Sequence, residues 1–107
     1  MNVHWSPHAE SLLDNIVIGI ATELSVDDGL HWEGKLRAAA TGIGEFPFAG
    51  PTVPAECFHT IPSNADRLRQ IIVKPYRIVY ETVGDEVHIL SIRHSRMLVT
   101  MDDAVWS

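Results

Sequence analysis

The stretch that most constrains the fold covers residues 68–96 and reads LRQIIVKPYRIVYETVGDEVHILSIRHSR. β-Branched and aromatic residues dominate two parts of it, residues 76–81 and 87–93, as largely buried strands require. Between them, Gly84-Asp85 supplies the positive φ that a tight hairpin turn needs. Earlier in the stretch, Lys74-Pro75 suits a turn, because proline has no N–H to donate to a sheet. The stretch therefore predicts three consecutive antiparallel strands.

The Gly84-Asp85 loop fixes the register of the second hairpin, and the alternation of side chains then assigns its two faces. The predicted cross-strand pairs are Glu81 with His88, Val79 with Leu90, and Arg77 with Ile92. One face carries no charge and is predicted to be the core; its residues are Ile78, Tyr80, Val87 and Ile89. The opposite face mixes apolar, charged and histidine side chains, which predicts a docking surface or a shallow site; its residues are Val79, Leu90, Ile92, Arg77, Glu81, His88 and His94.

The strand over residues 68–73 precedes the Lys74-Pro75 turn. If those two residues form the loop, Gln70 and Ile72 share the face of Arg77, and Arg69 points toward the core. A register slip of one residue reverses this assignment. The sequence therefore leaves the side of Arg69 open.

The N-terminal part of the chain predicts a short strand followed by a helical hairpin. The strand covers residues 2–5, and Ser6-Pro7 starts a helix over about residues 7–24, where apolar residues recur at helical spacing. The segment Ser25 to Asp28 resembles a capping box and opens a second helix. Gly42, Gly44 and Pro47 are predicted to end that helix. The short connection makes the pair antiparallel.

The segments on either side of the three-strand stretch lack a regular pattern. Residues 46–66 are rich in proline and glycine and predict an irregular connection, with one brief strand near residues 57–60. The residues after Arg96 predict a frayed end that finishes with an exposed Trp106.

Length and composition predict one domain over residues 1–107, with 46% hydrophobic and 21% charged residues. The single cysteine, Cys57, cannot form an internal disulfide, so the chain suits a reducing compartment and a cytoplasmic location is expected. Neither a signal peptide nor an apolar stretch long enough to cross a membrane is expected. His4 and His8 have metal-like spacing, but no cysteine or carboxylate completes a ligand set. Neither a metal nor a cofactor is expected.

Charge is unevenly distributed along the chain. Residues 1–66 contain two basic and nine acidic residues, whereas residues 67–107 contain six basic and five acidic ones. The net charge of −6 argues against extended contact with RNA or DNA, because neutralisation of phosphates by Lys and Arg dominates the affinity of nucleic-acid binders.

The order of the predicted elements and several motifs resemble the RelE/ParE toxin superfamily over roughly residues 2–97. The motifs, in chain order, are Pro47-x-x-Gly50, Arg69-x-Ile71-x-Val73, Tyr76-Arg77-Ile78-Val79-Tyr80, Gly84-Asp85, Val87-His88-Ile89-Leu90 and His94-Ser95-Arg96. The resemblance implies an α+β fold, in which an N-terminal strand and an antiparallel helical hairpin pack on a twisted antiparallel sheet. It also implies the toxin half of a type II toxin–antitoxin, or plasmid stabilisation, module. The implied partner is a small antitoxin whose C-terminal segment wraps the helices and the sheet.

This superfamily contains two mechanisms. ParE-like members inhibit growth by binding DNA gyrase and catalyse nothing, whereas RelE-like members cut messenger RNA in the ribosome. Cleavage requires a base, a cation at the phosphate and an acid. Arg77 falls on the superfamily's phosphate-binding arginine and Arg96 lies near a later one, but the lysine-rich segment is absent and His94 is offset by two positions from the catalytic histidine. The ParE-like, non-catalytic interpretation therefore fits better.

The candidate site residues follow from these interpretations. The catalytic candidates, if the chain is a ribonuclease, are Arg77, Arg96 and His94; the partner-binding candidates are Arg69, Arg77, Glu81, His88 and Trp106. Two structural alternatives are open: Arg77 pairs with Glu81 on its own face, or His94 and Arg96 cap a strand end. Three functions are open: a gyrase-binding toxin, which fits best, a ribosome-dependent mRNA endoribonuclease, and a non-toxic antitoxin-binding module. A homodimer within the toxin–antitoxin complex is open as well.

Overall fold

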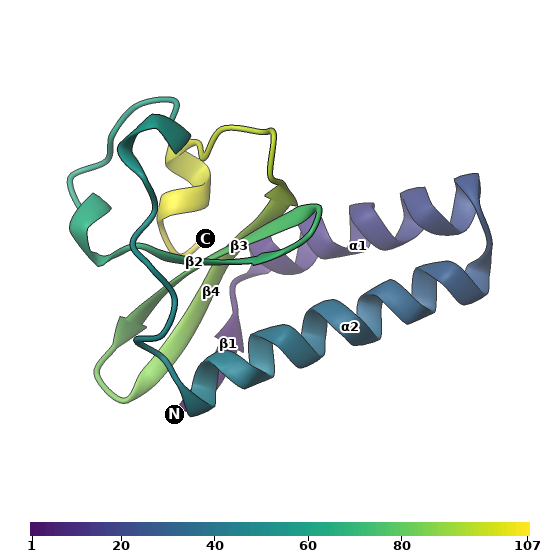
Figure 1. Cartoon of the computed structure of the whole chain (residues 1–107), viewed down its shortest axis with the longest axis horizontal. Helices are drawn as coiled ribbons and strands as arrows, with labels where there is room; N and C mark the ends of the chain where they lie inside the picture. The colour runs from purple at the N-terminus through teal and green to yellow at the C-terminus, as the bar shows by residue number, and fades with distance from the viewer.

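Two helices pack on one face of a four-stranded open sheet in the computed structural model, which describes residues 1–107 (Figure 1). The strands and helices are β1 (Asn2–Trp5), α1 (Pro7–Glu23), α2 (Val26–Glu45), β2 (Arg69–Val73), β3 (Tyr76–Val83) and β4 (Glu86–His94). Three short 3₁₀ helices complete the chain: η1 (Ala55–Cys57), η2 (Ala65–Arg67) and η3 (Met101–Ala104). The predicted α+β class, N-terminal strand and helical hairpin are confirmed.

Side-chain caps start both helices where the sequence predicts. The Ser6 hydroxyl accepts a hydrogen bond from the backbone N–H of Ala9 at 3.0 Å, and the Ser25 hydroxyl accepts one from the N–H of Asp28 at 3.1 Å. Such bonds satisfy N–H groups that have no partner inside the helix. The end of α2 differs from the prediction, because the helix continues through Gly42 and Gly44 and stops at Glu45.

The sheet has the order β1-β4-β3-β2 and is mixed, since β1 pairs with β4 in parallel and the other pairs are antiparallel. The β3–β4 hairpin turns at Gly84, whose φ of 61° is the left-handed conformation that favours glycine. The predicted pair of Glu81 with His88 is confirmed.

Beyond that pair, the predicted register is wrong by one residue. A β-bulge at Leu90 shifts the partners, so that Val79 lies opposite Ser91 and Arg77 lies opposite Arg93. A bulge adds one residue to one strand and so reverses the faces of everything that follows. Ile92 therefore joins the helix-side core instead of the face of Arg77, and His94 follows it to the helix side, where it lines a groove with α1.

The first hairpin settles the position of Arg69. Ile72 pairs with Arg77 and Gln70 pairs with Val79, which confirms that Gln70 and Ile72 share the face of Arg77. Arg69 lies on the helix side, opposite Tyr80. Because β2 is an edge strand, the Arg69 guanidinium turns outward, where Nη1 donates to the carbonyl oxygens of Gly50 at 2.7 Å and Phe48 at 3.2 Å.

Both faces of the sheet are covered. The core between the sheet and the helices contains Ala9, Leu13, Leu36, Ala40, Ile43, Ile78, Tyr80, Val87, Ile89 and Ile92. A second core on the far face contains Val53, Phe58, Leu68, Val79, Leu90, Val99 and Ala104, and is formed with the segment after α2 and the C-terminal tail (Figure 1).

Two expectations for these covering segments need correction. The brief strand expected near residues 57–60 is a single bridge between Phe58 and Val99. The tail expected to be frayed is packed, because Val99 and Ala104 are buried in the second core and the carbonyl of Ser107 accepts a hydrogen bond from the N–H of His8.

Neither α1 nor α2 has the combination of length and apolar character that a membrane-crossing helix needs.

Candidate functional site

Arg77, the central candidate from the sequence, lies on β3 with only 8% of its surface exposed. Its guanidinium makes three hydrogen bonds, each from a different nitrogen: Nε donates to Gln70 Oε1 at 2.8 Å, Nη1 to the carbonyl of Met97 at 3.2 Å, and Nη2 to Cys57 Sγ at 3.4 Å. It forms no ion pair with Glu81, the structural alternative that the sequence left open. Arg77 thus ties the segment around Cys57 and the start of the tail to the sheet.

His94 and Arg96 lie at the far end of β4. The His94 ring packs edge-on against Tyr76, with centroids 6.3 Å apart, and its Nδ1 accepts a hydrogen bond from the backbone N–H of Arg96 at 3.1 Å. This contact is the capped strand end that the sequence offered as the structural alternative. Because of the bulge, His94 projects to the helix side, whereas Arg77 projects to the other face. The three candidate catalytic side chains are therefore not brought together.

Three of the partner-binding candidates form one strip on the far face. Glu81 and His88 are cross-strand neighbours, and the His88 ring packs on Trp106 with centroids 4.7 Å apart. Trp106 itself is 46% exposed. His4 extends the strip across β1, since its ring lies 6.2 Å from that of His88 and its Nε2 pairs with Glu86 Oε2 at 2.8 Å.

Arg69 lies apart from this strip, at the edge of the sheet. Its guanidinium stacks over the Phe48 ring at 5.4 Å from the centroid and holds the two loop carbonyls described above. Tyr80 supports the same loop, because its hydroxyl donates to the carbonyl of Pro47 at 2.9 Å. Burial raises the pKa of Tyr80, so this hydroxyl stays protonated and remains a donor at neutral pH.

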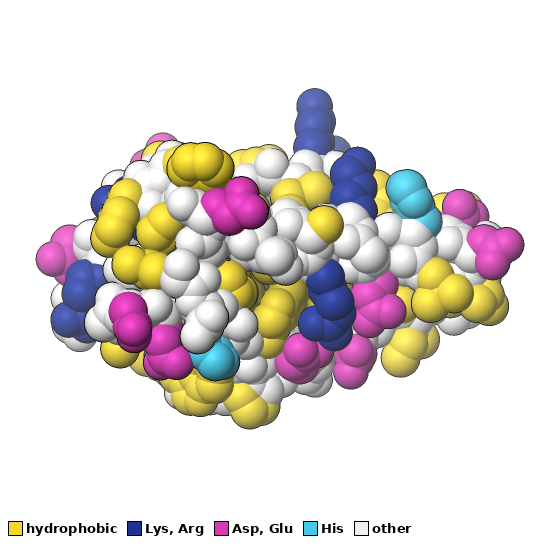
Figure 2. Space-filling view, turned by 90° about the horizontal axis from the view of Figure 1, so that it is seen from below, with side chains coloured by type: hydrophobic (Ala, Val, Ile, Leu, Met, Phe, Trp, Pro, Cys, Tyr) yellow, Lys and Arg dark blue, Asp and Glu magenta, His cyan; other side chains and the backbone are white.

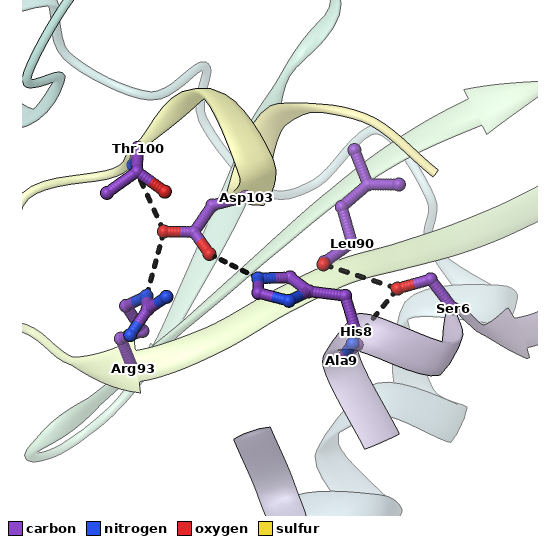
Figure 3. A network of polar contacts seen from close by, with 7 residues as sticks. All are labelled: Ser6, His8, Ala9, Leu90, Arg93, Thr100 and Asp103. Atoms are coloured by element: carbon purple, nitrogen blue, oxygen red, sulfur yellow. Dashed lines mark hydrogen bonds and ion pairs between the residues drawn. The ribbon is translucent and has the colours of Figure 1, made fainter. Parts of the chain in front are cut away.

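A polar network around Asp103 fixes the tail, and the sequence interpretation missed it (Figure 3). Asp103 is fully buried, yet both carboxylate oxygens are used. Oδ1 lies 2.8 Å from His8 Nε2, and Oδ2 accepts from Arg93 Nε at 2.8 Å and from the N–H of Thr100 at 3.0 Å. The signal that could have found it is the capping-box pattern Thr100-x-x-Asp103.

The same network explains the ionisation of Asp103. Burial alone would raise the pKa of this carboxyl, because a low dielectric disfavours charge. The hydrogen bonds from Arg93, His8 and the backbone of Thr100 outweigh burial and lower the pKa below its ordinary value of 3.8. Asp103 is therefore a charged anchor that joins α1, β4 and η3.

No group of three or more His, Cys, Asp or Glu side chains is arranged to hold a metal ion. His4 and His8, whose spacing is metal-like, contact different carboxylates, Glu86 and Asp103.

These features define a class of small α+β proteins in which a helical hairpin covers one face of an open mixed sheet. The sequence profile described as ParE toxin of type II toxin-antitoxin system, parDE, matches residues 3–99. The chain belongs to the ParE toxin family of type II toxin–antitoxin systems.

A solved structure agrees with this assignment at the level of the fold. The chain is similar to one described as the chromosomal ParDE TA system from P. aeruginosa, with a TM-score of 0.71 and 19% sequence identity, over 88% of this chain and 95% of that chain. Among curated proteins, none matches the sequence significantly.

Proposed function

We propose that this protein inhibits bacterial growth by binding DNA gyrase and that a cognate antitoxin neutralises it. The observation that carries the proposal is the ParE family match over residues 3–99. Both proposed partners act in the cytoplasm, which is where we place the protein. We further propose that the protein forms a homodimer within a toxin–antitoxin complex.

The position of Arg77 favours this function over ribonuclease activity. A cation that stabilises a phosphate must be free to contact it, but the Arg77 guanidinium is buried and makes three internal hydrogen bonds. His94 and Arg77 lie on opposite faces of the sheet, so they cannot act on one phosphate in this arrangement. The net charge of −6 also disfavours a polyanionic partner such as the ribosome.

We propose that the strip of Glu81, His88 and Trp106 contacts gyrase. Aromatic side chains that are partly exposed and rigidly held are common anchors of protein interfaces, and the His88 ring holds Trp106 in place. Arg69, with Phe48 beside it, lies apart from the strip, and we propose it as a separate partner contact at the sheet edge. Arg77 is buried and contributes to binding indirectly, because its hydrogen bonds hold the segments around Cys57 and Met97 on the sheet.

Induced expression in a bacterial host tests the function directly. We expect growth arrest with a DNA damage response and intact transcripts, and we expect the purified protein to inhibit DNA supercoiling by gyrase. Cleaved transcripts that become intact with Arg77→Ala would point to the ribonuclease instead. Normal growth at a high level of folded protein would leave the non-toxic antitoxin-binding module.

A matched pair of substitutions tests the proposed contact strip. Trp106 and Val105 are adjacent and each is 46% exposed. Truncation of an aromatic anchor typically weakens an interface strongly, so we expect Trp106→Ala to raise the concentration for half-inhibition of gyrase by about tenfold. Val105→Ala should leave it within about twofold, as most interface-neighbouring residues do. Equal inhibition by both variants would remove Trp106 from the proposed surface.

A further inference from the structure

The end of the helical hairpin where α1 meets α2 extends past the sheet (Figure 1). Only Leu24 and Ser25 join the two helices. We call residues 18–30, on both sides of this connection, the hairpin tip. Four large apolar side chains in the hairpin tip are 58–71% exposed; they are Ile18, Leu24, Val26 and Leu30. The tip is therefore an apolar surface that the rest of the chain leaves largely uncovered.

The hairpin tip is held rigidly although it lies beyond the sheet. A Cβ on Gly29 would stand 3.0 Å from the carbonyl oxygen of Val17 and 3.1 Å from the Cβ of Ala21, so the helices are in close contact here. The Ser25 hydroxyl accepts from the N–H of Asp28 at 3.1 Å and donates to its Oδ2 at 2.8 Å, which fixes the start of α2. Apolar side chains on a surface ordered in advance lose less conformational freedom when they bind.

The charge of the hairpin tip is negative throughout. The first 34 residues contain six acidic residues and no Lys or Arg. Two of these carboxylates pair with Arg37, but Glu23 and Asp27, in the tip, form no ion pair or side-chain hydrogen bond. In Figure 2, where the tip is at the right, acidic side chains lie beside apolar ones and no Lys or Arg is seen.

Glu23 lies where a carboxylate does not favour the helix. It is the last residue of α1, whose last turn contains no basic residue. The C-terminal end of a helix carries partial negative charge, so a cation is stabilising there and a carboxylate is not. Glu23 thus opposes the helix dipole and gains no internal contact in return. Residues that cost stability without a structural gain are typical of functional surfaces.

We propose that the hairpin tip is a second contact with gyrase and that it binds a basic, partly apolar surface of that enzyme. An enzyme that holds DNA neutralises phosphates with Lys and Arg and therefore presents basic surfaces. An apolar tip with carboxylates complements such a surface. A second copy of this chain fits less well, because Glu23 and Asp27 of the two copies would repel one another. This inference rests on the proposed function.

Two matched pairs of variants test the inference through the Kd for purified gyrase. Glu23→Lys reverses a tip charge, and Glu45→Lys makes the same change in the last residue of α2, so the net charge and the type of helix end are equal. Leu30→Gln removes an apolar side chain that is 58% exposed, and Ile61→Gln does so at 61% in the loop after α2. We expect the first member of each pair to bind about fivefold to tenfold more weakly and each control to bind within about twofold of the original protein.

Stability and salt separate a binding effect from a folding effect. A cation suits the end of α1, so Glu23→Lys should melt no earlier than the original protein while it binds gyrase more weakly. The difference in Kd between Glu23→Lys and the original protein should shrink as salt is raised from about 0.05 M to about 0.5 M, because salt screens exposed charges. The difference for Leu30→Gln should persist.

Four outcomes would overturn the inference while gyrase still binds the original protein. Unchanged Kd values for both Glu23→Lys and Leu30→Gln remove the tip from the interface. Equal weakening by Glu23→Lys and Glu45→Lys assigns the effect to net charge. Weaker antitoxin binding with an unchanged Kd for gyrase assigns the tip to the antitoxin. Dissociation of a dimer by Leu30→Gln, again with gyrase binding intact, assigns it to a second copy. If the original protein itself does not bind gyrase, the proposed function fails, and this inference fails with it.

Discussion

At the residue scale, two Arg–carboxylate ion pairs differ in their burial, and burial decides how much each contributes to stability. Arg37 makes a bidentate pair with Glu10, at 3.1 and 2.8 Å, that joins α1 to α2, but both side chains are about 40% exposed. The hydrogen bonds from Arg37 lower the pKa of Glu10. Arg93 pairs with Asp103, whose side chain has no exposure at all. Exposed pairs contribute little to stability, whereas a broken buried pair leaves a group without its partners.

We therefore expect unequal effects from two isosteric substitutions. Asp103→Asn should lower the free energy of unfolding by about 2–3 kcal/mol, because Arg93 and His8 lose their charged acceptor. Glu10→Gln should lower it by no more than about 0.5 kcal/mol. Urea unfolding at pH 7, followed by circular dichroism, measures both. Similar losses for the two variants would show that burial does not govern these pairs.

At the scale of elements, the loop after α2 docks on the sheet through a close backbone approach. A Cβ on Gly50 would stand 2.6 Å from the carbonyl oxygen of Gln70 and 2.6 Å from the Tyr80 hydroxyl. The first neighbour is backbone of β2 and cannot move without distorting the sheet. The same loop receives hydrogen bonds from Arg69 and Tyr80, so its position depends on having glycine here.

Gly50→Ala should accordingly destabilise the protein by about 2–3 kcal/mol, because overpacking forces the backbone to shift. Gly42, on the exposed side of α2, provides the control, since nothing lies within 4 Å of its added Cβ. Alanine is favoured over glycine inside helices, and Gly42→Ala should stabilise by about 0.5–1 kcal/mol. Thermal melts of both variants give the comparison. A neutral Gly50→Ala would mean that the loop is free to move away from β2.

At the scale of the whole molecule, the sequence predicts what is determined locally and misses what depends on distant contacts. Ser6, Ser25 and the apolar periodicity specify the helices within a few residues. Glu81 and His88 lie close to their turn, so the turn alone sets their pairing. The bulge at Leu90 has no local signal, because it serves two cores at once: Leu90 is buried on the far face and Ile92 on the helix side.

The same reasoning applies to the candidate site. The pattern within β3 identifies Arg77 as a candidate. Its partners Gln70, Cys57 and Met97 come from other segments, and these contacts bury it. The packing of the tail has no local signal, because Asp103 is held by His8, which lies 95 positions away in the sequence. Glu81, His88 and Trp106 could be proposed from sequence, yet only the packed tail brings Trp106 onto His88.

Two carboxyl groups, Asp103 in the packed tail and Glu10 on α1, determine how the stability of the whole molecule responds to acid. The pKa values of Asp103 and Glu10 are lowered in the folded state, so the folded protein holds these protons less tightly than the unfolded chain. Their contribution to stability is complete above the ordinary values of 3.8 and 4.5 and is lost as the pH falls through the lower, folded values. The free energy of unfolding should therefore fall below about pH 4.

Asp103→Asn isolates the part of this acid response that belongs to the tail. Asparagine cannot ionise, so the stability difference between the original protein and Asp103→Asn should be largest at pH 7. It should be narrower at pH 3, because the unfolded chain then binds a proton at Asp103, which favours unfolding of the original protein only. Urea unfolding at both pH values measures it, and Glu10→Gln, whose pair is exposed, should show little change in the difference. If the stability difference between the original protein and Asp103→Asn is the same at pH 7 and pH 3, the loss of stability in this variant comes from altered packing. The charge of Asp103 would then not be what holds the tail on the sheet.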